Sequence, residues 1–310
     1  MKKSWIRSML FVPGHKRDWI IKACRYGADA LILDLEDSVP AELKDYAREQ
    51  VCSAVKEIAT TAGPDTPALF VRVNGWETGE LLADVTAVAS EVSLQGLVLA
   101  KVRGPGDVQA LSLVLDNIDH QRDRDSDRLE IVPMPETVTA VRDIEAVCRA
   151  STRVHRLTGI SGLTPGSAGD LQSDIGVEPS GDGMEMLYAD SRCVLGARAA
   201  GLAQILGGQS SRLDDPDIQR RSWRRAKMLG ASGSTAIHPS QIEIIHDVFT
   251  PSAAEVESAS RMLKAFDAAV ADGNAAIRYN GEMIDYAQVQ RLRGLIERAK
   301  SYGVGTVASD

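Results

Sequence analysis

The sequence has few cysteines, no long apolar run and no excess of positive charge. Its four cysteines, Cys24, Cys52, Cys148 and Cys193, lie far apart and form no CxxC pair, which argues against a disulfide framework or a zinc site. No run approaches the ~18 apolar residues of a membrane span, and the basic N-terminus lacks the longer apolar core of a signal peptide. The net charge is −8, with Lys and Arg spread along the chain, so nothing resembles a nucleic-acid footprint. We therefore expect a cytoplasmic protein with neither a membrane nor a nucleic-acid partner.

Short apolar runs recur along the chain, and helical patterns lie between them. The eight runs occupy residues 8–14, 30–37, 69–75, 96–102, 129–136, 154–162, 201–208 and 233–240. Several are continuous rather than alternating, as parallel strands covered on both faces should be. Eight such units predict an α/β fold of the (β/α)8 TIM-barrel type, with a doubly wound open sheet as the alternative. A charge-rich segment, 119–128, is predicted to be a solvated loop.

The pattern changes past residue 249. Residues 1–249 account for the predicted barrel, which we expect to be the catalytic domain. Residues 250–310 are predicted to be a C-terminal extension made of a helix, a turn or short hairpin and a last helix, over 250–273, 277–285 and 286–303. An extension of this kind could cap the barrel or reach the active site of a neighbouring subunit.

Two carboxylates stand at the ends of neighbouring runs: Glu136 ends the fifth run, and Asp170 follows the sixth. In a TIM barrel the catalytic groups lie at the carboxyl ends of the strands. Oxygen ligands with no Cys and no paired His nearby suit Mg²⁺, which often takes only one or two protein carboxylates. We therefore take these two as the first choice for metal ligands. A structural role is the alternative for each, in the first turn of a helix for Glu136 and as an N-cap for Asp170.

The second run ends in three carboxylates, because LILDLEDSV carries Asp34, Glu36 and Asp37. Arg72, within LFVRVNG, puts a guanidinium in the middle of an apolar strand, which is costly unless the charge is paired. It must therefore face carboxylates or a bound anion, and its fork suits a substrate carboxylate. Lys101, within VLAKVRG, has a similar setting but could instead reach the barrel rim.

Taken together, these stretches resemble the citrate lyase β-subunit-like proteins, within the wider group of HpcH/HpaI-type aldolases. The matching motifs run in order over nearly the whole chain: RSMLFVPGHKRD, GADALILDLEDSVPAELKDYAR, FVRVNG, IVPMPET, GDLQSDIG, DGMEMLYADSRCVLGARAAG, LGASGSTAIHPSQIEIIHDVF and NGEMID. Each motif alone is weak, but together they are specific. One stretch departs from the family: SGLTPGSAGDL is longer than the tight turn that many members have before the second ligand. That departure bears on the shape of the pocket and hence on the substrate.

The resemblance implies a barrel with a C-terminal extension, assembled as a homotrimer or a dimer of trimers. It implies Mg²⁺ held by Glu136 and Asp170. Arg72 matches the family arginine that contacts the 2-oxo acid or its acyl-CoA adduct. Asp37 matches a pocket carboxylate that supports the metal-bound water or the arginine, and Glu36 lies beside it as a candidate substrate contact.

The resemblance also implies residues that come from outside the strand ends. Asp285, in GEMID, matches the aspartate that enters the neighbouring subunit's site as general acid/base in acyl-CoA lyase members. CoA would lie over the barrel mouth, and Arg7, Lys16 and Arg17 are the candidate contacts for its phosphates.

The function that these residues imply is Mg²⁺-dependent carbon–carbon lyase chemistry. The enzyme would cleave or form a 3-hydroxyacyl-CoA such as malyl-, citramalyl- or citryl-CoA, with a 2-oxo acid and acetyl-CoA on the other side of the reaction. Three alternatives stay open: a malyl-CoA-type thioester hydrolase, a citrate lyase β subunit acting on a carrier-protein thioester, and a non-catalytic paralogue that binds CoA or a 2-oxo acid.

Overall fold

The computed structural model describes residues 3–91, 93–121 and 128–304. The chain divides into two compact units, Met1–Val248 and Phe249–Asp310. Within the described residues, no helix is both long and apolar enough to cross a membrane. Of the segment predicted to be a solvated loop, residues 122–127 lie outside the described ones. Residues 119–121 instead end a helix, and Asp119 is buried.

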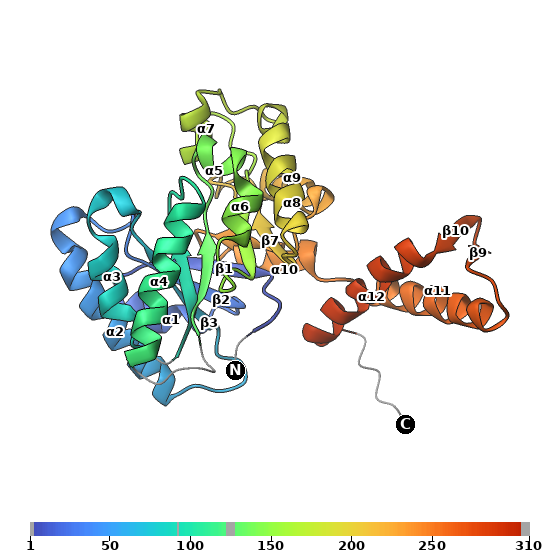
Figure 1. Cartoon of the computed structure of the whole chain (residues 1–310), viewed down its shortest axis with the longest axis horizontal. Coiled ribbons are helices and arrows are strands. Elements are labelled where there is room, and N and C mark those ends of the chain that lie inside the picture. The colour runs from blue at the N-terminus through green and yellow to red at the C-terminus, as the bar shows by residue number, and fades with distance from the viewer. Residues whose placement is uncertain (1–2, 92, 122–127, 305–310) are drawn as a thin grey trace. The chain divides into compact units, whose positions relative to one another are not determined.

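Parallel strands form the wall of the first unit (Figure 1). They are β1 (Ser8–Pro13), β2 (Ala30–Asp34), β3 (Ala68–Val73), β4 (Leu94–Leu99), β5 (Glu130–Pro133), β6 (Arg156–Ile160), β7 (Gln204–Gly207) and β8 (Ser234–Ala236). Hydrogen bonds join six of them in the order β5-β4-β3-β2-β1-β8, and β6 pairs with β7. A bridge between Leu206 and Gly233 links β7 to β8, and the Ile131 N–H donates to the Arg153 carbonyl before β6 over 3.0 Å. The strands thus follow one another around a ring, and the predicted TIM-barrel fold is confirmed.

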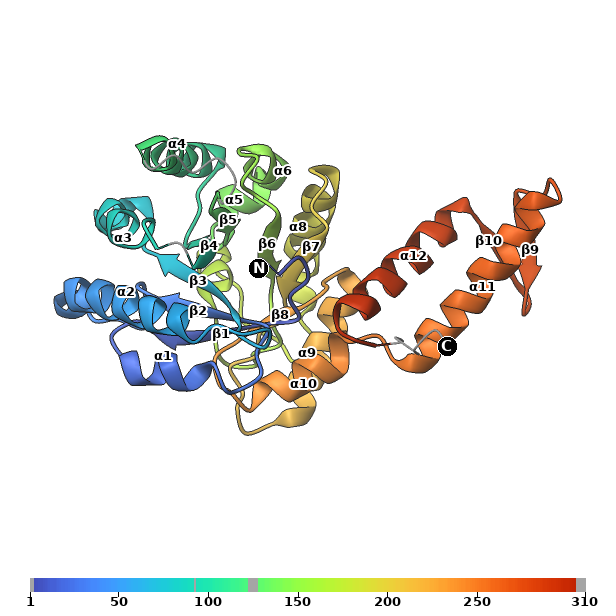
Figure 2. The same ribbon diagram turned by 90° about the horizontal axis from the view of Figure 1, so that it is seen from below.

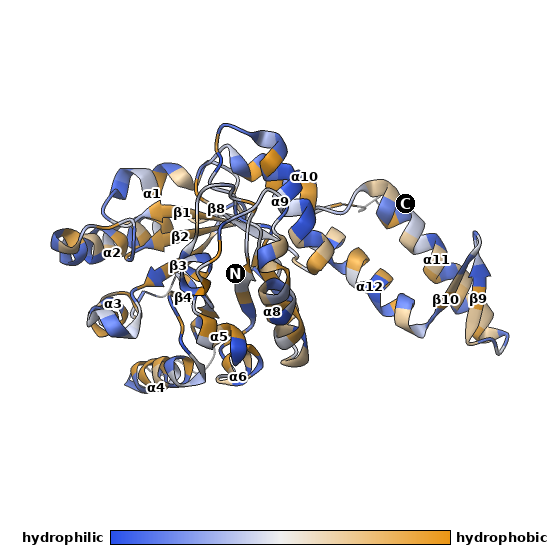
Figure 3. Cartoon of the chain, turned by 90° about the horizontal axis from the view of Figure 1, so that it is seen from above, coloured by the Kyte–Doolittle hydropathy of each residue, from blue (hydrophilic) through white to orange (hydrophobic). Residues whose placement is uncertain are grey.

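Helices follow the strands and lie outside the ring (Figure 2). They are α1 (Arg17–Ala23), α2 (Lys44–Thr60), α3 (Leu81–Val88), α4 (Pro105–Gln121), α5 (Val138–Arg142), α6 (Ile144–Arg149), α7 (Asp170–Ile175), α8 (Leu187–Ala199), α9 (Pro216–Leu229) and α10 (Gln241–Phe249), with short 3-10 turns at Ala41–Leu43, Trp76–Thr78 and Met184–Met186. In α2, Ala47, Val51 and Val55 recur at helical spacing and are buried, so this face packs inward. Figure 3 shows the contrast between the mostly hydrophobic strands β1 and β2 and the mostly hydrophilic helix α9.

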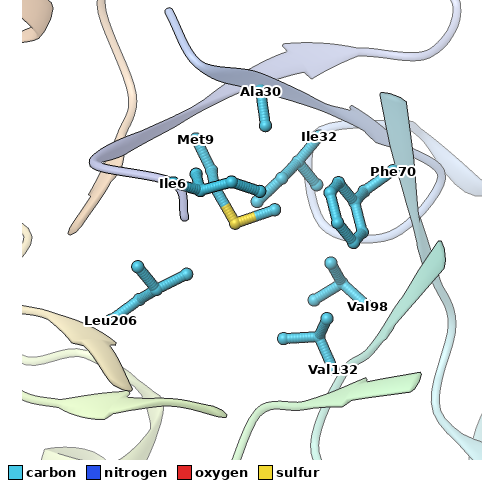
Figure 4. Packing of buried hydrophobic residues seen from close by; sticks show 8 residues of the cluster. All are labelled: Ile6, Met9, Ala30, Ile32, Phe70, Val98, Val132 and Leu206. Carbon is cyan, nitrogen blue, oxygen red and sulfur yellow. The ribbon is translucent and has the colours of Figure 1, made fainter. Parts of the chain in front are cut away.

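Apolar side chains from most of the strands meet inside the ring (Figure 4). The cluster consists of Ile6, Met9, Ala30, Ile32, Phe70, Val98, Val132 and Leu206. Side chains two positions apart on a strand point to the same face. The residues that follow Ile32 and Phe70 on the inward face are therefore Asp34 and Arg72. The carboxyl end of the barrel thus carries charge directly above an apolar floor.

The second unit is a pair of helices with a hairpin between them. Its elements are α11 (Ala253–Ala271), β9 (Ala276–Tyr279), β10 (Glu282–Asp285) and α12 (Tyr286–Ser301). The turn at Asn280-Gly281 has positive φ at both residues, 49° and 89°, which suits a two-residue hairpin. Phe266, Ile284 and Val289 form a small core of its own.

Candidate active site

The centre of the site is an ion pair between two neighbouring strands. Asp34 ends β2 and lies directly opposite Arg72 of β3 in the parallel register. Arg72 donates from Nε to Asp34 Oδ1 over 2.6 Å and from Nη2 to Oδ2 over 2.8 Å, and its guanidinium lies 4.8 Å from the centre of the Phe11 ring. Burial opposes ionisation of Asp34, but the bonds from Arg72 outweigh it and hold the pKa of this carboxyl below its usual range. The sequence predicted that Arg72 faces carboxylates or a bound anion, and Asp34 is one such carboxylate.

Glu36 and Asp37 extend this pair into a network with a second cation. Arg72 Nη1 lies 2.7 Å from Glu36 Oε2 and 4.0 Å from Asp37 Oδ2. Lys101 Nζ lies 2.7 Å from Glu36 Oε1 and 3.0 Å from Asp37 Oδ1. Burial raises the pKa of Glu36. The pKa of Lys101 is raised for a different reason: the carboxylates of Glu36 and Asp37 both face its ammonium and stabilise the charge. Arg72 and Lys101 thus contact the three carboxylates directly, and Glu36 lies between the two cations.

The segment that carries these carboxylates is fixed from behind. Lys44 Nζ donates to the carbonyls of Leu35 and Glu36 over 2.6 and 2.8 Å and to Asn74 Oδ1 over 2.9 Å. Asn74 Nδ2 donates to the Leu35 carbonyl over 2.8 Å. On the β1 side, a Cβ at Gly14 would lie 2.5 Å from the Asp34 carbonyl oxygen, so only glycine allows β1 and β2 to approach this closely. The backbone of the segment that carries Glu36 and Asp37 is therefore held by the side chains of Lys44 and Asn74.

A hydrogen bond from the backbone of Lys101, which follows β4, to the side chain of Glu136, which follows β5, joins these two strand ends. Lys101 has φ of 48°, the left-handed region that residues with a side chain rarely adopt. In this conformation its N–H donates to Glu136 Oε2 over 3.1 Å, while its ammonium reaches Glu36 and Asp37. Strain of this kind persists where the surroundings impose it, and it often marks functional sites. Lys101 thus connects the carboxylates of β2 with the carboxylate that follows β5.

Glu136 and Asp170 line one cavity of about 280 Å³. Burial raises the pKa of Glu136 to about 7; Arg72 opposes this shift, and the charges of Asp170 and Glu36 add to it. The Val138 N–H of α5 donates to Asp174 Oδ2 of α7 over 2.7 Å, which ties together the two segments that carry Glu136 and Asp170. The two predicted metal ligands are therefore brought to one cavity in a field of excess negative charge.

The donor set suits a hard divalent cation that keeps several water ligands. Across residues 3–91, 93–121 and 128–304, no group of three His, Cys, Asp or Glu side chains has metal-binding geometry. Two carboxylates are enough for Mg²⁺, which commonly binds one or two of them together with waters and substrate oxygens. A soft or borderline metal would need thiolate or imidazole ligands, and neither lines the cavity. The residues present thus fit Mg²⁺.

The three predicted phosphate contacts are not brought to one place. Lys16 is exposed at the start of α1, just beyond the carboxyl end of β1. Arg17 faces helix α2, where it donates to Ser53 Oγ over 3.2 Å and pairs with Glu57. Arg7 precedes β1 and therefore lies at the opposite end of the barrel, where it forms a two-pronged pair with Asp29. This position removes Arg7 from the candidate substrate contacts.

Asp285 belongs to the second unit. It ends β10 and is the N-cap of α12, where its Oδ1 accepts from the N–H groups of Ala287 and Gln288 over 3.0 and 3.4 Å. Its side chain is exposed. An exposed cap leaves the second carboxylate oxygen accessible to other groups, so the predicted role in a neighbouring subunit stays a prediction.

The search of known families and proteins gives a consistent result. The profile described as HpcH/HpaI aldolase/citrate lyase matches residues 7–239, and one described as a C–C bond lyase of the TIM-barrel fold matches residues 216–304. A citrate lyase subunit beta-like protein of Deinococcus radiodurans is 31% identical over 94% of this chain and 96% of its own length. A (3S)-malyl-CoA thioesterase of Cereibacter sphaeroides is 30% identical over 95% of each chain. The structure of Mycobacterium tuberculosis CitE in complex with magnesium, acetoacetate and coenzyme A superposes with a TM-score of 0.72 at 22% identity, covering 96% of this chain and 100% of that one.

Proposed function

Because the chain belongs to the HpcH/HpaI aldolase/citrate lyase family, we propose that it is a Mg²⁺-dependent carbon–carbon lyase that acts on a 3-hydroxyacyl-CoA. Malyl-, citramalyl- and citryl-CoA are the proposed substrates, and cleavage of each leaves a 2-oxo acid and acetyl-CoA. The reverse condensation would use the same site. The observation that carries the proposal is the pairing of Glu136 and Asp170 at one cavity, within the field of Arg72.

Glu136 and Asp170 would hold the Mg²⁺. Repulsion between the Glu136 carboxylate and its neighbours Asp170 and Glu36 supports this assignment, since a divalent cation would relieve it. When bound, the ion would supply a Lewis acid for the substrate's hydroxyl and carboxylate oxygens. The magnesium in the related CitE structure supports the same choice.

Arg72 would stabilise negative charge on the substrate's oxygens. Asp34 holds its guanidinium from one side and fixes its orientation, while N–H donors remain for a substrate oxygen. A fixed cation in a partly dry site costs little reorganisation when charge develops in the transition state. Burial opposes ionisation of Asp37, but Lys101 and Arg72 outweigh it and hold its pKa below the usual range. Asp37 would therefore stay ionised and keep the Lys101 ammonium in place.

Asp285 is proposed to protonate or deprotonate the methyl carbon of the acetyl-CoA product, from a neighbouring subunit of a cytoplasmic homotrimer or dimer of trimers. The exposed side chain of Asp285 at the start of α12 supports this role, and the unit that carries it has a small core of its own. CoA is proposed to lie over the barrel mouth, with Lys16 and Arg17 as its phosphate contacts.

Asp285→Asn should lower turnover by about 10²- to 10⁴-fold while leaving the fold intact, because Asn is as good an N-cap as Asp but cannot transfer a proton. Steady-state kinetics and thermal unfolding would measure the two effects. Ser252→Asn, the same kind of exchange at the N-cap of α11, is the matched control and should change neither. Co-expression of Asp285→Asn and Glu136→Gln chains should restore part of the activity, since some sites would receive an intact residue from each chain. Unchanged turnover of Asp285→Asn would rule out the proposed acid/base.

The test of the function is mass spectrometry of the products formed from malyl-, citramalyl- and citryl-CoA with Mg²⁺, before and after chelation. A 2-oxo acid and a shorter acyl-CoA are the expected products, and chelation should abolish their formation until Mg²⁺ is restored. Activity that survives chelation would contradict the metal assignment. Turnover of no thioester would overturn the lyase proposal and favour a carrier-protein substrate or a binding role.

A thioester hydrolase is the second candidate, because the malyl-CoA thioesterase relative is nearly as similar to this chain as the citrate lyase-like one. The same experiment separates them. Free CoA with an intact hydroxy acid would identify the hydrolase, since the carbon–carbon bond would then survive.

A further inference from the structure

Asp170 lies on a long excursion of the chain, residues 161–183, between β6 and the turn that precedes α8. Between Leu163 and Gly183 the residues are exposed or half-buried, apart from Gln172, so this stretch has no apolar core of its own. A segment that buries so little is only as well placed as its anchors. The position of Asp170 therefore depends on the two ends of the excursion and on the bond from α5 to Asp174.

Asp190 of α8 holds the first end of the excursion. It is 0% exposed, and its Oδ1 accepts from the Ser161 N–H over 2.8 Å. Ser161 comes directly after β6, so this bond fixes the point at which the chain leaves the barrel wall. Two residues further on, the Leu163 N–H donates to the buried Ser222 Oγ of α9 over 2.7 Å. Buried side chains of α8 and α9 thus hold the exit from β6.

Arg225 of α9 holds the second end and joins it to the first. It donates from Nη1 to Asp190 Oδ2 over 2.7 Å and from Nη2 to the Gly183 carbonyl over 2.8 Å. Gly183 has φ of 70°, and a Cβ there would lie 2.8 Å from Leu163 Cδ2 and 3.1 Å from the Arg225 guanidinium carbon. Only glycine allows so close an approach. One ion pair therefore closes the base of the excursion, where Ser161 and Gly183 are held.

We propose that Asp190 and Arg225 are positioning residues for the metal site: by closing the base of the excursion, they hold Asp170 at the cavity that Glu136 also lines. This inference rests on the proposed lyase function and adds the residues that set the affinity of its site for Mg²⁺. Neither Asp190 nor Arg225 lines the cavity, so neither would be a ligand. Removing partners that act on a metal site through its ligands commonly weakens metal binding by about 10- to 100-fold.

The carboxylate of Asp190 suits this role because both of its oxygens are used. One accepts from the backbone and the other from the guanidinium, whereas an asparagine amide has a single oxygen that can accept. Asp190→Asn must therefore leave either the Ser161 N–H or an Arg225 N–H without its acceptor. A buried donor without an acceptor is costly, so the base of the excursion should loosen.

The first test is calorimetric titration of the chelator-treated protein with MgCl₂. Asp190→Asn should raise the dissociation constant for Mg²⁺ by about 10- to 100-fold. Turnover at saturating Mg²⁺ should stay within about threefold of the natural kcat, because Glu136 and Asp170 are both still present. A purely structural role would lower the amount of folded protein but leave the dissociation constant of the folded fraction unchanged.

Asp119→Asn is the matched control for this titration. It makes the same exchange in another buried ion pair, between Asp119 of α4 and Arg153. Arg153 precedes β6 and so lies at the amino end of the barrel, away from the cavity. The control should change neither the dissociation constant nor kcat.

Hydrogen exchange gives a readout that does not need the metal. Peptides that cover residues 161–176 should exchange at least about tenfold faster in Asp190→Asn than in the natural protein, because their anchor is weakened. Peptides from β2 and β3 should exchange as before, and Asp119→Asn should leave residues 161–176 unaffected. Unchanged exchange of these residues in Asp190→Asn would contradict the role of the ion pair as their anchor.

The double variant Asp190→Asn with Arg225→Gln removes both charges, so it leaves no unpaired charge buried if a single exchange prevents folding. It should weaken Mg²⁺ binding by about the same 10- to 100-fold, because both residues act through one base. Mg²⁺ affinity equal to that of the natural protein in the folded variants would overturn this inference and leave the lyase intact. A natural protein that binds no Mg²⁺ would overturn the metal assignment, and this inference with it.

Discussion

Arg72→Met is expected to lower the free energy of unfolding by about 3–5 kcal/mol at pH 7, because it leaves the buried Asp34 carboxylate without its cation and Glu36 with Lys101 alone. Arg72 is 9% exposed and Asp34 is 1% exposed, so water cannot replace the lost pairing. Arg72→Lys keeps one positive charge but loses the fork, and it should lower turnover by about 10²- to 10³-fold. Urea unfolding and steady-state kinetics would measure the two losses.

The pH dependence of this loss follows from Asp34. Arg72 depresses its folded-state pKa, so the stability that this carboxylate contributes is present above its ordinary pKa and disappears as the pH falls through the folded value. The difference between Arg72→Met and the natural protein should therefore shrink in acid.

Two variants check the interpretation. Arg103→Met removes an exposed arginine paired with Asp107 and should change stability by no more than about 1 kcal/mol. The double variant Arg72→Met with Asp34→Asn should recover part of the stability that the single variant loses, because the buried charge is removed with its partner. An Arg72→Met protein as stable as Arg103→Met would mean that the network is solvated in solution.

Glu136→Gln is expected to have opposite effects on activity and stability. Mg²⁺-dependent turnover should fall by at least about 10³-fold, since a neutral amide is a poor ligand for a hard cation. The metal-free protein should instead become more stable by about 3 kcal/mol at pH 8, because the carboxylate has a pKa of about 7 in the folded state and is therefore costly to ionise there. Kinetics and urea unfolding in chelator would measure both effects.

The sign of the stability effect can be checked by titration. A carboxyl whose pKa is raised on folding destabilises the folded state progressively as the pH rises from its unfolded value of 4.5 through about 7. The advantage of Glu136→Gln should accordingly vanish near pH 4.5 and reach its full size by pH 8. Asp170→Asn is the control: this exposed carboxylate should lose turnover in the same way but leave stability within about 0.5 kcal/mol. A Glu136→Gln protein that is less stable at pH 8 would refute the account of its environment.

The sequence predicted the positions of the barrel strands and the charged groups at their ends. Continuous apolar runs are a strong signal for parallel strands, and the rule that catalytic groups follow them placed Glu136 and Asp170 together. The sequence could not identify the carboxylate that pairs with Arg72. Asp34 faces Arg72 only because of the register between β2 and β3, which follows from packing across the sheet. Lys101 was left undecided because its left-handed backbone conformation is invisible in the sequence.

Arg7 shows how a motif can mislead. It lies inside the matching stretch RSMLFVPGHKRD, and the resemblance suggested a phosphate contact. A residue that precedes a barrel strand belongs at the amino end of the ring, and the ion pair with Asp29 places it there. The positional rule that was applied to Glu136 would have excluded Arg7.

The ring of strands is built from two ladders of unequal size, and this division has an evolutionary consequence. The six-stranded ladder carries Asp34 and Arg72, whereas β6 and β7 form a separate pair. The loop that follows β6 carries Thr164. Insertions and replacements in that loop leave the hydrogen-bonded register of the larger ladder untouched. We expect descendants of one ancestor to have diverged by remodelling residues 161–168 of that loop, while Asp170 and the charged network of the larger ladder changed little.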